Sequence, residues 1–191
     1  ILGHSGFIGS HLMEGLATLI PDVELIGRSF PDIDLRKSGS AKTLLPFLGS
    51  QTAVIMLSAI KRQFGDTLES LEQNMAMCVN LAQLLETRPI ARLIFFSSMA
   101  VYGEDIDNTQ ITENTAICLR SYYGIAKYFG ELIFEKVFYS QGGSLVILRP
   151  PLIYGPGDQG NTYGPAGFLD AVRNNRTITL WGDGDELREF I

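Results

Sequence analysis

Four short apolar runs punctuate the chain. They cover residues 23–27 (VELIG), 53–59 (AVIMLSA), 92–98 (RLIFFSS) and 144–150 (SLVILRP). Their apolar residues are mostly branched or aromatic and follow one another without polar alternation, a pattern typical of parallel strands covered on both faces. The runs therefore predict four buried, parallel strands.

Between these runs, apolar positions recur every three or four residues. This spacing predicts helices over 10–20, 68–88 and 121–141, the first beginning at Ser10, a residue type that caps helix N-termini. A strand followed by a helix, repeated along the chain, is typical of a doubly wound α/β domain. We therefore predict an α/β fold with a doubly wound parallel sheet, the Rossmann fold.

The composition changes after residue 150. Residues 150–167 are dense in Pro, Gly and Tyr and predict an extended loop, which a helix over 168–174 and a short strand over 177–182 follow. We expect a Rossmann domain over 1–150 and the beginning of a smaller C-terminal substrate lobe over 151–191. We also expect the sequence to be cut at both ends, because only two residues precede the first glycine.

Charge and composition narrow the classes of partner. The 191 residues are 46% apolar and 19% charged, with a formal net charge of −6, which argues against a nucleic-acid or anionic-membrane partner. No apolar run reaches the roughly 18 residues that span a bilayer. Cys78 and Cys118 have no metal-ligand spacing with His4 or His11, so we expect packed thiols, no metal and a cytoplasmic location.

Three glycines, Gly3, Gly6 and Gly9, lie between a two-residue strand stump and the first helix. In a nucleotide-binding βαβ unit such glycines permit the tight turn, the approach of backbone N–H groups to a pyrophosphate, and close helix–strand packing. A strict G-x-G-x-x-G motif would need glycine where His4 stands. An ordinary tight turn therefore remains the alternative to a dinucleotide site.

The end of the second predicted strand bears on the cofactor. NAD-preferring folds carry an acid here for the adenosine 2′-hydroxyl, whereas an arginine accommodates a 2′-phosphate. The segment LIGRS has no acid, so Arg28 with Ser29 favours NADP over NAD; a solvated surface arginine is the alternative. Asp34 is a candidate acceptor for the adenine amino group or, alternatively, a helix cap.

Tyr123 and Lys127 are four residues apart on a predicted helix, so both side chains project from one face. An ammonium near a phenol lowers the phenol's pKa, which suits a general acid/base for interconverting a carbonyl and an alcohol. Ser97 and Ser98 end a predicted buried strand at the sheet edge where open α/β folds bind ligands. A serine hydroxyl there is a candidate to hold the reacting oxygen; the start of an ordinary loop is the alternative.

Five motifs follow one another in order: GxxGxxG, SSxxVYG, YxxxK, RPPLIYGPG and GDGxxxREFI. Together they resemble the extended short-chain dehydrogenase/reductases, and most of all the NAD(P)-dependent sugar-nucleotide epimerase/dehydratase family, over residues 1–191. The resemblance implies that Ser98, Tyr123 and Lys127 are catalytic and that Lys127 also binds the nicotinamide ribose. The expected substrate contacts are Ser98, Asn161 and Arg188.

The cofactor is expected to be NADP or NAD, with NADP favoured. The residues expected to bind it are Gly3, Ser5, Gly6, Phe7, Ile8, Gly9, Arg28, Asp34, Leu57, Ser58, Ala59, Tyr123 and Lys127. Members of the resembled family commonly dimerise through the helices that correspond to 68–88 and 121–141. The resemblance therefore makes a homodimer a candidate assembly.

Departures from the resembled family narrow the chemistry. Its 4,6-dehydratases carry an Asp-Glu pair where this chain has Met99 and Ala100, and its epimerising reductases use a cysteine at Ala100, so both activities are disfavoured. Leu152 stands where many members have an asparagine. We therefore expect a 4-epimerase or ketoreductase of a nucleotide-linked sugar. An extended reductase of a non-sugar alcohol or ketone, or a dinucleotide-sensing regulator without catalysis, is the alternative.

Overall fold

Three parallel strands form the centre of the molecule. The computed structural model describes residues 1–103, 110–158, 164–178 and 190–191. Within them β1 (Ala53–Met56), β2 (Arg92–Phe96) and β3 (Ser144–Leu148) lie side by side in that order. Every pairing between them is parallel. This confirms the predicted α/β class and its parallel sheet.

The chain before the first glycine extends the sheet on its β1 side. Leu2 forms parallel bridges both to Met56 and to Arg28, and the backbone of Ile1 bonds Ile26 and Arg28. The predicted strand over 23–27 is therefore wrong, because the bridge is formed at Arg28, one residue after the predicted strand, and residues 23–27 form no ladder. Within residues 23–27, the hydrogen bond to the sheet is the one that the carbonyl oxygen of Ile26 accepts from the nitrogen of Ile1, and a single bond does not form a ladder.

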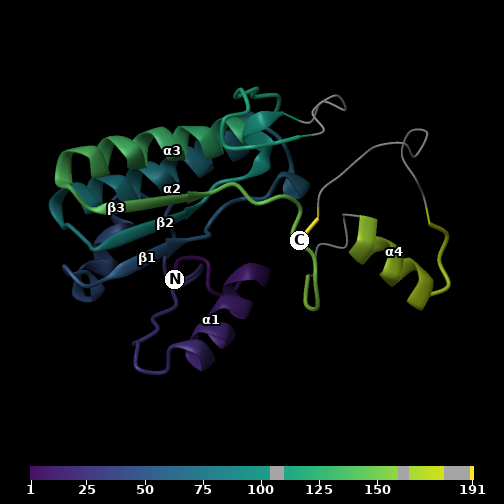
Figure 1. The fold of residues 1–191 in the computed structure, drawn as a ribbon, viewed down its shortest axis with the longest axis horizontal. Coiled ribbons are helices and arrows are strands. Elements are labelled where there is room, and N and C mark those ends of the chain that lie inside the picture. The colour runs from purple at the N-terminus through teal and green to yellow at the C-terminus, as the bar shows by residue number, and fades with distance from the viewer. Residues whose placement is uncertain (104–109, 159–163, 179–189) are drawn as a thin grey trace.

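Helices cover both faces of the sheet (Figure 1). On one face α2 (Leu68–Thr87) and α3 (Tyr122–Gln141) pack beside each other, and α1 (Phe7–Leu19) lies on the opposite face. Three short 3-10 helices, η1 (Ser40–Phe47), η2 (Arg62–Phe64) and η3 (Met99–Tyr102), lie in the connections. The order of strands and helices confirms a doubly wound arrangement.

The first helix begins earlier than predicted. Gly6 is the N-cap of α1, and no side chain caps it. Ser10 lies inside the helix, where its hydroxyl donates to the carbonyl oxygen of Phe7 at 3.0 Å. The expected capping role of Ser10 is therefore wrong, because the glycine turn itself opens directly into the helix.

The core lies between the sheet and the α2–α3 layer. Leu81 and Leu85 of α2, Leu93 and Phe95 of β2 and Phe134 of α3 are almost completely buried. The rings of Phe95 and Phe134 meet edge to face with centroids 5.1 Å apart. Burial of these side chains fixes α3 against β2, which positions the first turn of α3 at the carboxyl end of that strand.

The chain after residue 150 departs from the sheet. Leu152 forms a parallel bridge with Phe190, and α4 (Gly164–Arg173) begins four residues before the predicted helix over 168–174. Most of the predicted strand over 177–182 lies outside the described residues. Figure 1 shows α4 apart from the sheet, and the division into a domain over 1–150 and a lobe over 151–191 stays a prediction.

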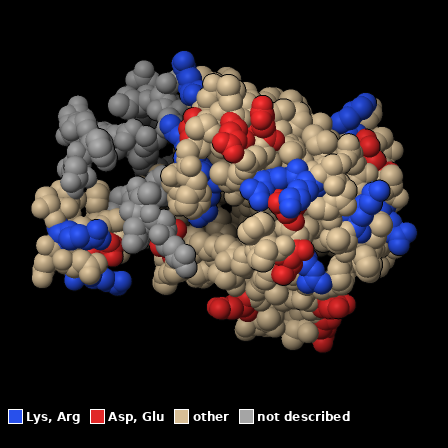
Figure 2. Space-filling model, turned by 180° about the vertical axis from the view of Figure 1, so that it is seen from behind, with Lys and Arg blue, Asp and Glu red and all other residues tan. Residues whose placement is uncertain are grey.

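The surface carries charges of both signs. On the face seen in Figure 2, Lys and Arg side chains are interspersed with Asp and Glu. Within the described residues, no helix combines the length and apolar character needed to cross a membrane. In the same part of the chain, no three His, Cys, Asp or Glu side chains are grouped so that they could hold a metal ion.

Candidate active site

The glycine turn is closely packed. Gly3 has a φ of +88°, a left-handed conformation that favours glycine, and a Cβ there would lie 2.9 Å from the nitrogen of Ser58. A Cβ on Gly9 would lie 2.2 Å from the carbonyl oxygen of Gly3. Glycine is thus required at Gly3, because the end of β1 lies against it, and at Gly9, because α1 lies against the turn there.

The N-terminus of α1 suits an anion. An α-helix leaves the N–H groups of its first turn without partners inside the helix, and here no side chain caps them and no acidic residue lies in the first turn. The helix dipole adds partial positive charge at this end. Backbone N–H groups of Phe7, Ile8 and Gly9 therefore fit the pyrophosphate of a dinucleotide, with Ser5 exposed beside them.

His4 holds the glycine turn against residues 27–29. Its Nδ1 lies 2.9 Å from the hydroxyl of Ser29, which also accepts a hydrogen bond from the backbone N–H of Ser5 at 3.1 Å. A Cβ on Gly27 would lie 2.4 Å from the His4 ring. The histidine at the position where a strict G-x-G-x-x-G motif would begin is therefore accommodated by Gly27 and held by Ser29.

Arg28 lies at the site edge on an aromatic support. Its guanidinium carbon is 4.6 Å from the centre of the Phe47 ring, and it donates to the carbonyl oxygen of Gly27 at 2.8 Å. Ser29, in contrast, is buried and bonded to His4. The sequence suggested Arg28 and Ser29 for a 2′-phosphate. Of these two, Ser29 is engaged in holding the glycine turn, whereas Arg28 is not.

Asp34 forms an ion pair with a neighbour. The guanidinium of Arg36 donates to both carboxylate oxygens, with the Nε–Oδ1 distance 2.7 Å. These hydrogen bonds lower the pKa of Asp34. Because its oxygens already accept from Arg36, a contact of Asp34 with adenine would have to share them.

The carboxyl end of β1 lies against the glycine turn. Leu57 donates its backbone N–H to Leu2, and Gly3 approaches Leu57 and Ser58 within van der Waals distance. Asn74 of α2 is bonded to both backbone groups of Ile60, at 2.8 and 3.0 Å. This anchors the segment with Leu57, Ser58 and Ala59, so the residues predicted there to bind the dinucleotide adjoin the glycine turn.

Tyr123 and Lys127 lie on one face of α3. The Lys127 nitrogen is 5.6 Å from the centre of the Tyr123 ring and donates to the carbonyl oxygen of Phe96 at 2.6 Å. Burial lowers the pKa of Lys127 to about 8 and raises that of Tyr123 to about 12. The direction for Tyr123 is opposite to the sequence-based expectation, because here the ammonium is bonded to Phe96 and the phenol is desolvated.

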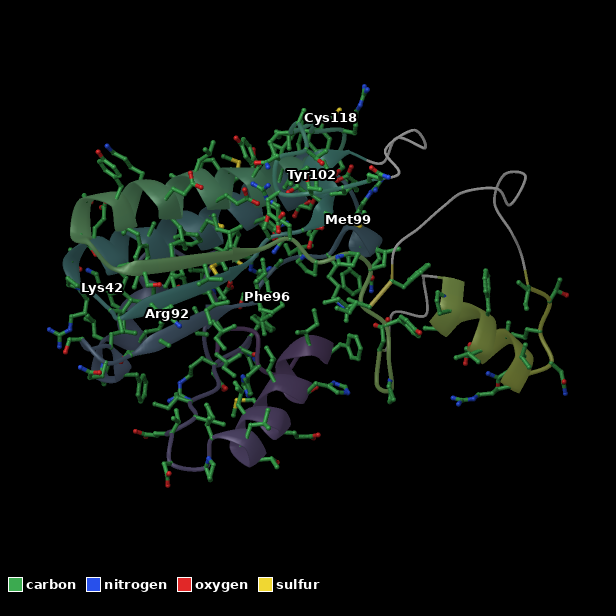
Figure 3. The ribbon with its side chains drawn as sticks, in the orientation of Figure 1. Lys42, Arg92, Phe96, Met99, Tyr102 and Cys118 are labelled. Atoms are coloured by element: carbon green, nitrogen blue, oxygen red, sulfur yellow. The ribbon has the colours of Figure 1, made fainter. Side chains whose placement is uncertain are left out.

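Ser98 lies where β2 gives way to η3. It is the N-cap of η3, and its hydroxyl accepts from the backbone N–H of Ala100 at 3.2 Å. A Cβ on Gly124 would lie 2.6 Å from the carbonyl oxygen of Ala100, so the first turn of α3 packs directly on η3. In Figure 3, Phe96, Met99 and Tyr102 trace this path at the carboxyl end of the sheet, away from Lys42 and Arg92.

Two acidic residues of the site were missed from the sequence. The carboxylate of Asp66 accepts from the backbone N–H groups of Tyr122 and Tyr123, and that of Glu131 lies buried one turn after Lys127. The four-residue spacing of Lys127 and Glu131 was a usable signal, but nothing local links Asp66 to a helix 57 positions away. Two predicted substrate contacts, Asn161 and Arg188, lie outside the described residues.

The parallel sheet wound with helices on both faces, with a glycine turn at its carboxyl edge, defines a Rossmann-fold protein of the dinucleotide-binding class. Residues 1–191 match the model of the NAD dependent epimerase/dehydratase family, and the chain belongs to that family. It is accordingly an enzyme of the extended short-chain dehydrogenase/reductase type.

Individual relatives agree with this membership. The chain is 25% identical to a putative UDP-glucose 4-epimerase of Methanocaldococcus jannaschii, covering all of the chain and 68% of the relative. A UDP-N-acetylglucosamine 4-epimerase structure from Methanobrevibacter ruminantium superposes with a TM-score of 0.82 at 25% identity, over 100% of this chain and 67% of that one. A Thermus thermophilus UDP-glucose 4-epimerase in complex with NAD gives 0.80 at 25% identity, over 100% and 68%.

Proposed function

We propose that this chain carries the cofactor-binding and catalytic residues of an NAD(P)-dependent 4-epimerase that acts on a nucleotide-linked sugar. The observation that carries the proposal is the packing of the Tyr123 turn of α3 onto η3, whose N-cap is Ser98. Relatives named as UDP-sugar 4-epimerases support the substrate class. Reduction of a keto sugar is the alternative outcome of the same chemistry.

Tyr123 is proposed as the group that moves the proton. With a pKa of about 12, its phenol holds a proton at neutral pH and is ready to donate to a carbonyl oxygen. Acceptance of a proton from a sugar hydroxyl requires a nearby positive charge to stabilise the phenolate. Lys127 supplies it by turning from the carbonyl oxygen of Phe96 toward the phenol, 5.6 Å from the ring centre.

Ser98 is proposed to hold the reacting oxygen through its hydroxyl. When bound, the nicotinamide supplies the acceptor and donor of hydride. Tyr123 takes the hydroxyl proton as the sugar carbon is oxidised and returns it on reduction. Return of the hydride to the other face of the ketone would then give the epimer. Reduction of a supplied keto sugar would instead consume NADPH or NADH, with Tyr123 giving the proton.

NADP is the proposed preferred cofactor. The support is Arg28, whose guanidinium rests on Phe47 at the end of the segment that carries the ribose-binding residue in dinucleotide folds. The residues proposed to hold the cofactor are Gly3, Ser5, Gly6, Phe7, Ile8, Gly9, Arg28, Asp34, Leu57, Ser58, Ala59, Tyr123 and Lys127. The family description itself is NAD dependent, and NAD is the alternative.

The substrate side of the proposal rests on the family. Asn161 and Arg188, in the lobe proposed over 151–191, are proposed to contact the nucleotide-linked sugar together with Ser98. Met99 and Ala100 offer no acid or base for elimination of water, which favours epimerisation over dehydration. A homodimer through α2 and α3 and a cytoplasmic location remain part of the proposal.

The test uses the protein incubated with UDP-, dTDP- and GDP-linked sugars and either NADPH or NADH. Conversion of one sugar to its epimer without net cofactor consumption indicates an epimerase; net consumption with a keto sugar indicates a reductase. Tyr123→Phe should lower turnover by about 10²-fold or more while the cofactor still binds, because the proton donor is lost and the other cofactor contacts stay.

Tyr122→Phe is the matched control, since Tyr122 is the adjacent tyrosine and lies more exposed on α3. Its turnover should remain close to that of the parent. Near-normal turnover of Tyr123→Phe would contradict the assignment of the proton-transfer residue. Failure of every sugar nucleotide, with turnover of a simple ketone, would favour a non-sugar reductase instead.

A further inference from the structure

Glu131 is a completely enclosed carboxylate. It is 1% exposed and lies one helical turn after Lys127 on α3. One carboxylate oxygen accepts from the hydroxyl of Ser97, and both accept from the guanidinium of Arg149, at 2.9 and 2.5 Å. A buried charge persists only with such partners, since an unpaired carboxylate in the interior is strongly disfavoured.

Arg149 carries the same network to η3. It follows the last residue of β3, and its Nη1 donates to the hydroxyl of the buried Tyr102 at 2.6 Å. The guanidinium carbon lies 5.0 Å from the centre of the Tyr102 ring. Hydrogen bonds to Glu131 raise the pKa of Arg149, so the guanidinium stays charged at neutral pH.

The hydrogen bonds of Glu131 and Arg149 hold the segment that carries Ser98 at both of its ends. Ser97 precedes it directly, Tyr102 ends η3, and one carboxylate–guanidinium pair holds both. Glu131 belongs to the same helix as Tyr123 and Lys127. We propose that the Glu131–Arg149 pair is the positioning element of the active site, which sets Ser98 against the Tyr123–Lys127 face and holds a carboxylate one helical turn from the Lys127 ammonium.

The groups around Lys127 support the second part of the proposal, which concerns the Glu131 carboxylate and the Lys127 ammonium. Burial lowers its pKa, and Cys78 and Glu131 act in the opposite direction. Cys78, from α2, is itself desolvated and has a pKa of about 11, so its thiol is neutral at pH 7. The Tyr123 phenol is also neutral there, and Arg149 is a cation. Among these groups, Glu131, the carboxylate paired with Arg149, is therefore the one expected to raise the pKa of Lys127 at working pH.

This inference rests on the proposed function, and its test includes a measurement that needs no substrate. The chain has five lysines, so a lysine-labelled protein gives a small set of NMR signals, of which Lys127→Met identifies one. In Glu131→Gln the titration midpoint of Lys127 should move to lower pH by about one pH unit.

The enzymatic readout is the pH profile of turnover. If the charged ammonium is required, the loss of activity at alkaline pH should begin at lower pH in Glu131→Gln, with turnover about fivefold below the parent near pH 8. Glu135→Gln is the matched control, since Glu135 is exposed one turn further along α3. Its profile and its lysine titration should equal those of the parent.

A second variant keeps the test decisive if Glu131→Gln folds poorly. Glu131→Met combined with Arg149→Met removes both charges together, which buried ion pairs often tolerate. The Lys127 midpoint should still fall. An unchanged or raised midpoint in a folded variant overturns the inference, whatever the substrate. A parent protein without turnover on any sugar nucleotide, but with the expected shift of the midpoint, would overturn the proposed function alone.

Discussion

Two glycines of α1 have different structural roles. A methyl group on Gly9 would meet the carbonyl oxygen of Gly3 at 2.2 Å and the Cα of His4 at 2.7 Å, both of them backbone atoms that cannot move aside independently. A methyl group on Gly15, two turns later, would meet nothing within 4 Å. Gly9 therefore permits the close approach of α1 to the nucleotide-binding turn, whereas Gly15 only adds flexibility to the helix.

Alanine substitutions separate these roles. Gly15→Ala should raise the free energy of unfolding by about 0.5–1 kcal/mol, because alanine loses less backbone entropy in a helix. Gly9→Ala should lower it by about 1–3 kcal/mol through overpacking and should weaken dinucleotide binding. Urea unfolding and cofactor titration measure both. Equal effects of the two substitutions would show that the turn is not closely packed.

At the scale of elements, the N-terminus of α3 is held from outside the helix. Ser121 caps it by accepting from Gly124 at 3.0 Å. Asp66, in the connection before α2, accepts from the N–H groups of Tyr122 and Tyr123 at 3.3 and 2.9 Å. A carboxylate at this end also interacts favourably with the helix dipole. The turn that carries Tyr123 is thus tied to the segment after β1.

Removal of this carboxylate should affect stability and catalysis together. Asp66→Ala should lower the free energy of unfolding by about 1 kcal/mol, as is typical for the loss of a cap, and should lower turnover more than it changes cofactor affinity. Glu72→Ala, at an exposed acid on α2, should change neither. Unfolding midpoints and turnover of Asp66→Ala that match those of Glu72→Ala would contradict the role of Asp66.

At the scale of the whole molecule, sequence periodicity located the central sheet and the two long helices but not the strand ends. The apolar runs predicted strands over 53–59, 92–98 and 144–150. The observed strands end two or three residues before these predicted ends, at Met56, Phe96 and Leu148. The residues that follow these points, among them Ser97, Ser98 and Arg149, leave the ladder but stay buried or half-buried. They turn out of the sheet at the edge where the site forms.

Long-range contacts limit how much of the candidate site can be predicted from the sequence. Motif spacing located Tyr123 and Lys127, since a helix brings positions four apart to one face. Ser97 and Glu131 are 34 positions apart, and their hydrogen bond depends on the packing of α3 on β2. The raised pKa of Tyr123 likewise follows from burial, which no local pattern encodes.

The buried lysine should leave a mark on the stability of the whole protein. Its pKa is lowered from 10.5 to about 8 by desolvation, whereas in the unfolded chain it returns to its ordinary value. Between these two pH values the unfolded state binds more protons than the folded state, so Lys127 makes the free energy of unfolding rise with pH in this window. Below about pH 8 both states are protonated and its contribution is constant.

The comparison with Lys127→Met isolates this effect. Cys78 and Tyr123, whose pKa values are raised to about 11 and 12, titrate in the opposite sense but are present in both proteins. The stability of the parent relative to Lys127→Met should therefore increase between about pH 7.5 and pH 9.5 in urea unfolding experiments. Lys136→Met, at an exposed lysine of the same helix, should show no such increase relative to the parent. A constant or falling difference for Lys127→Met would mean that the folded protein holds this lysine in a solvated or fully compensated environment.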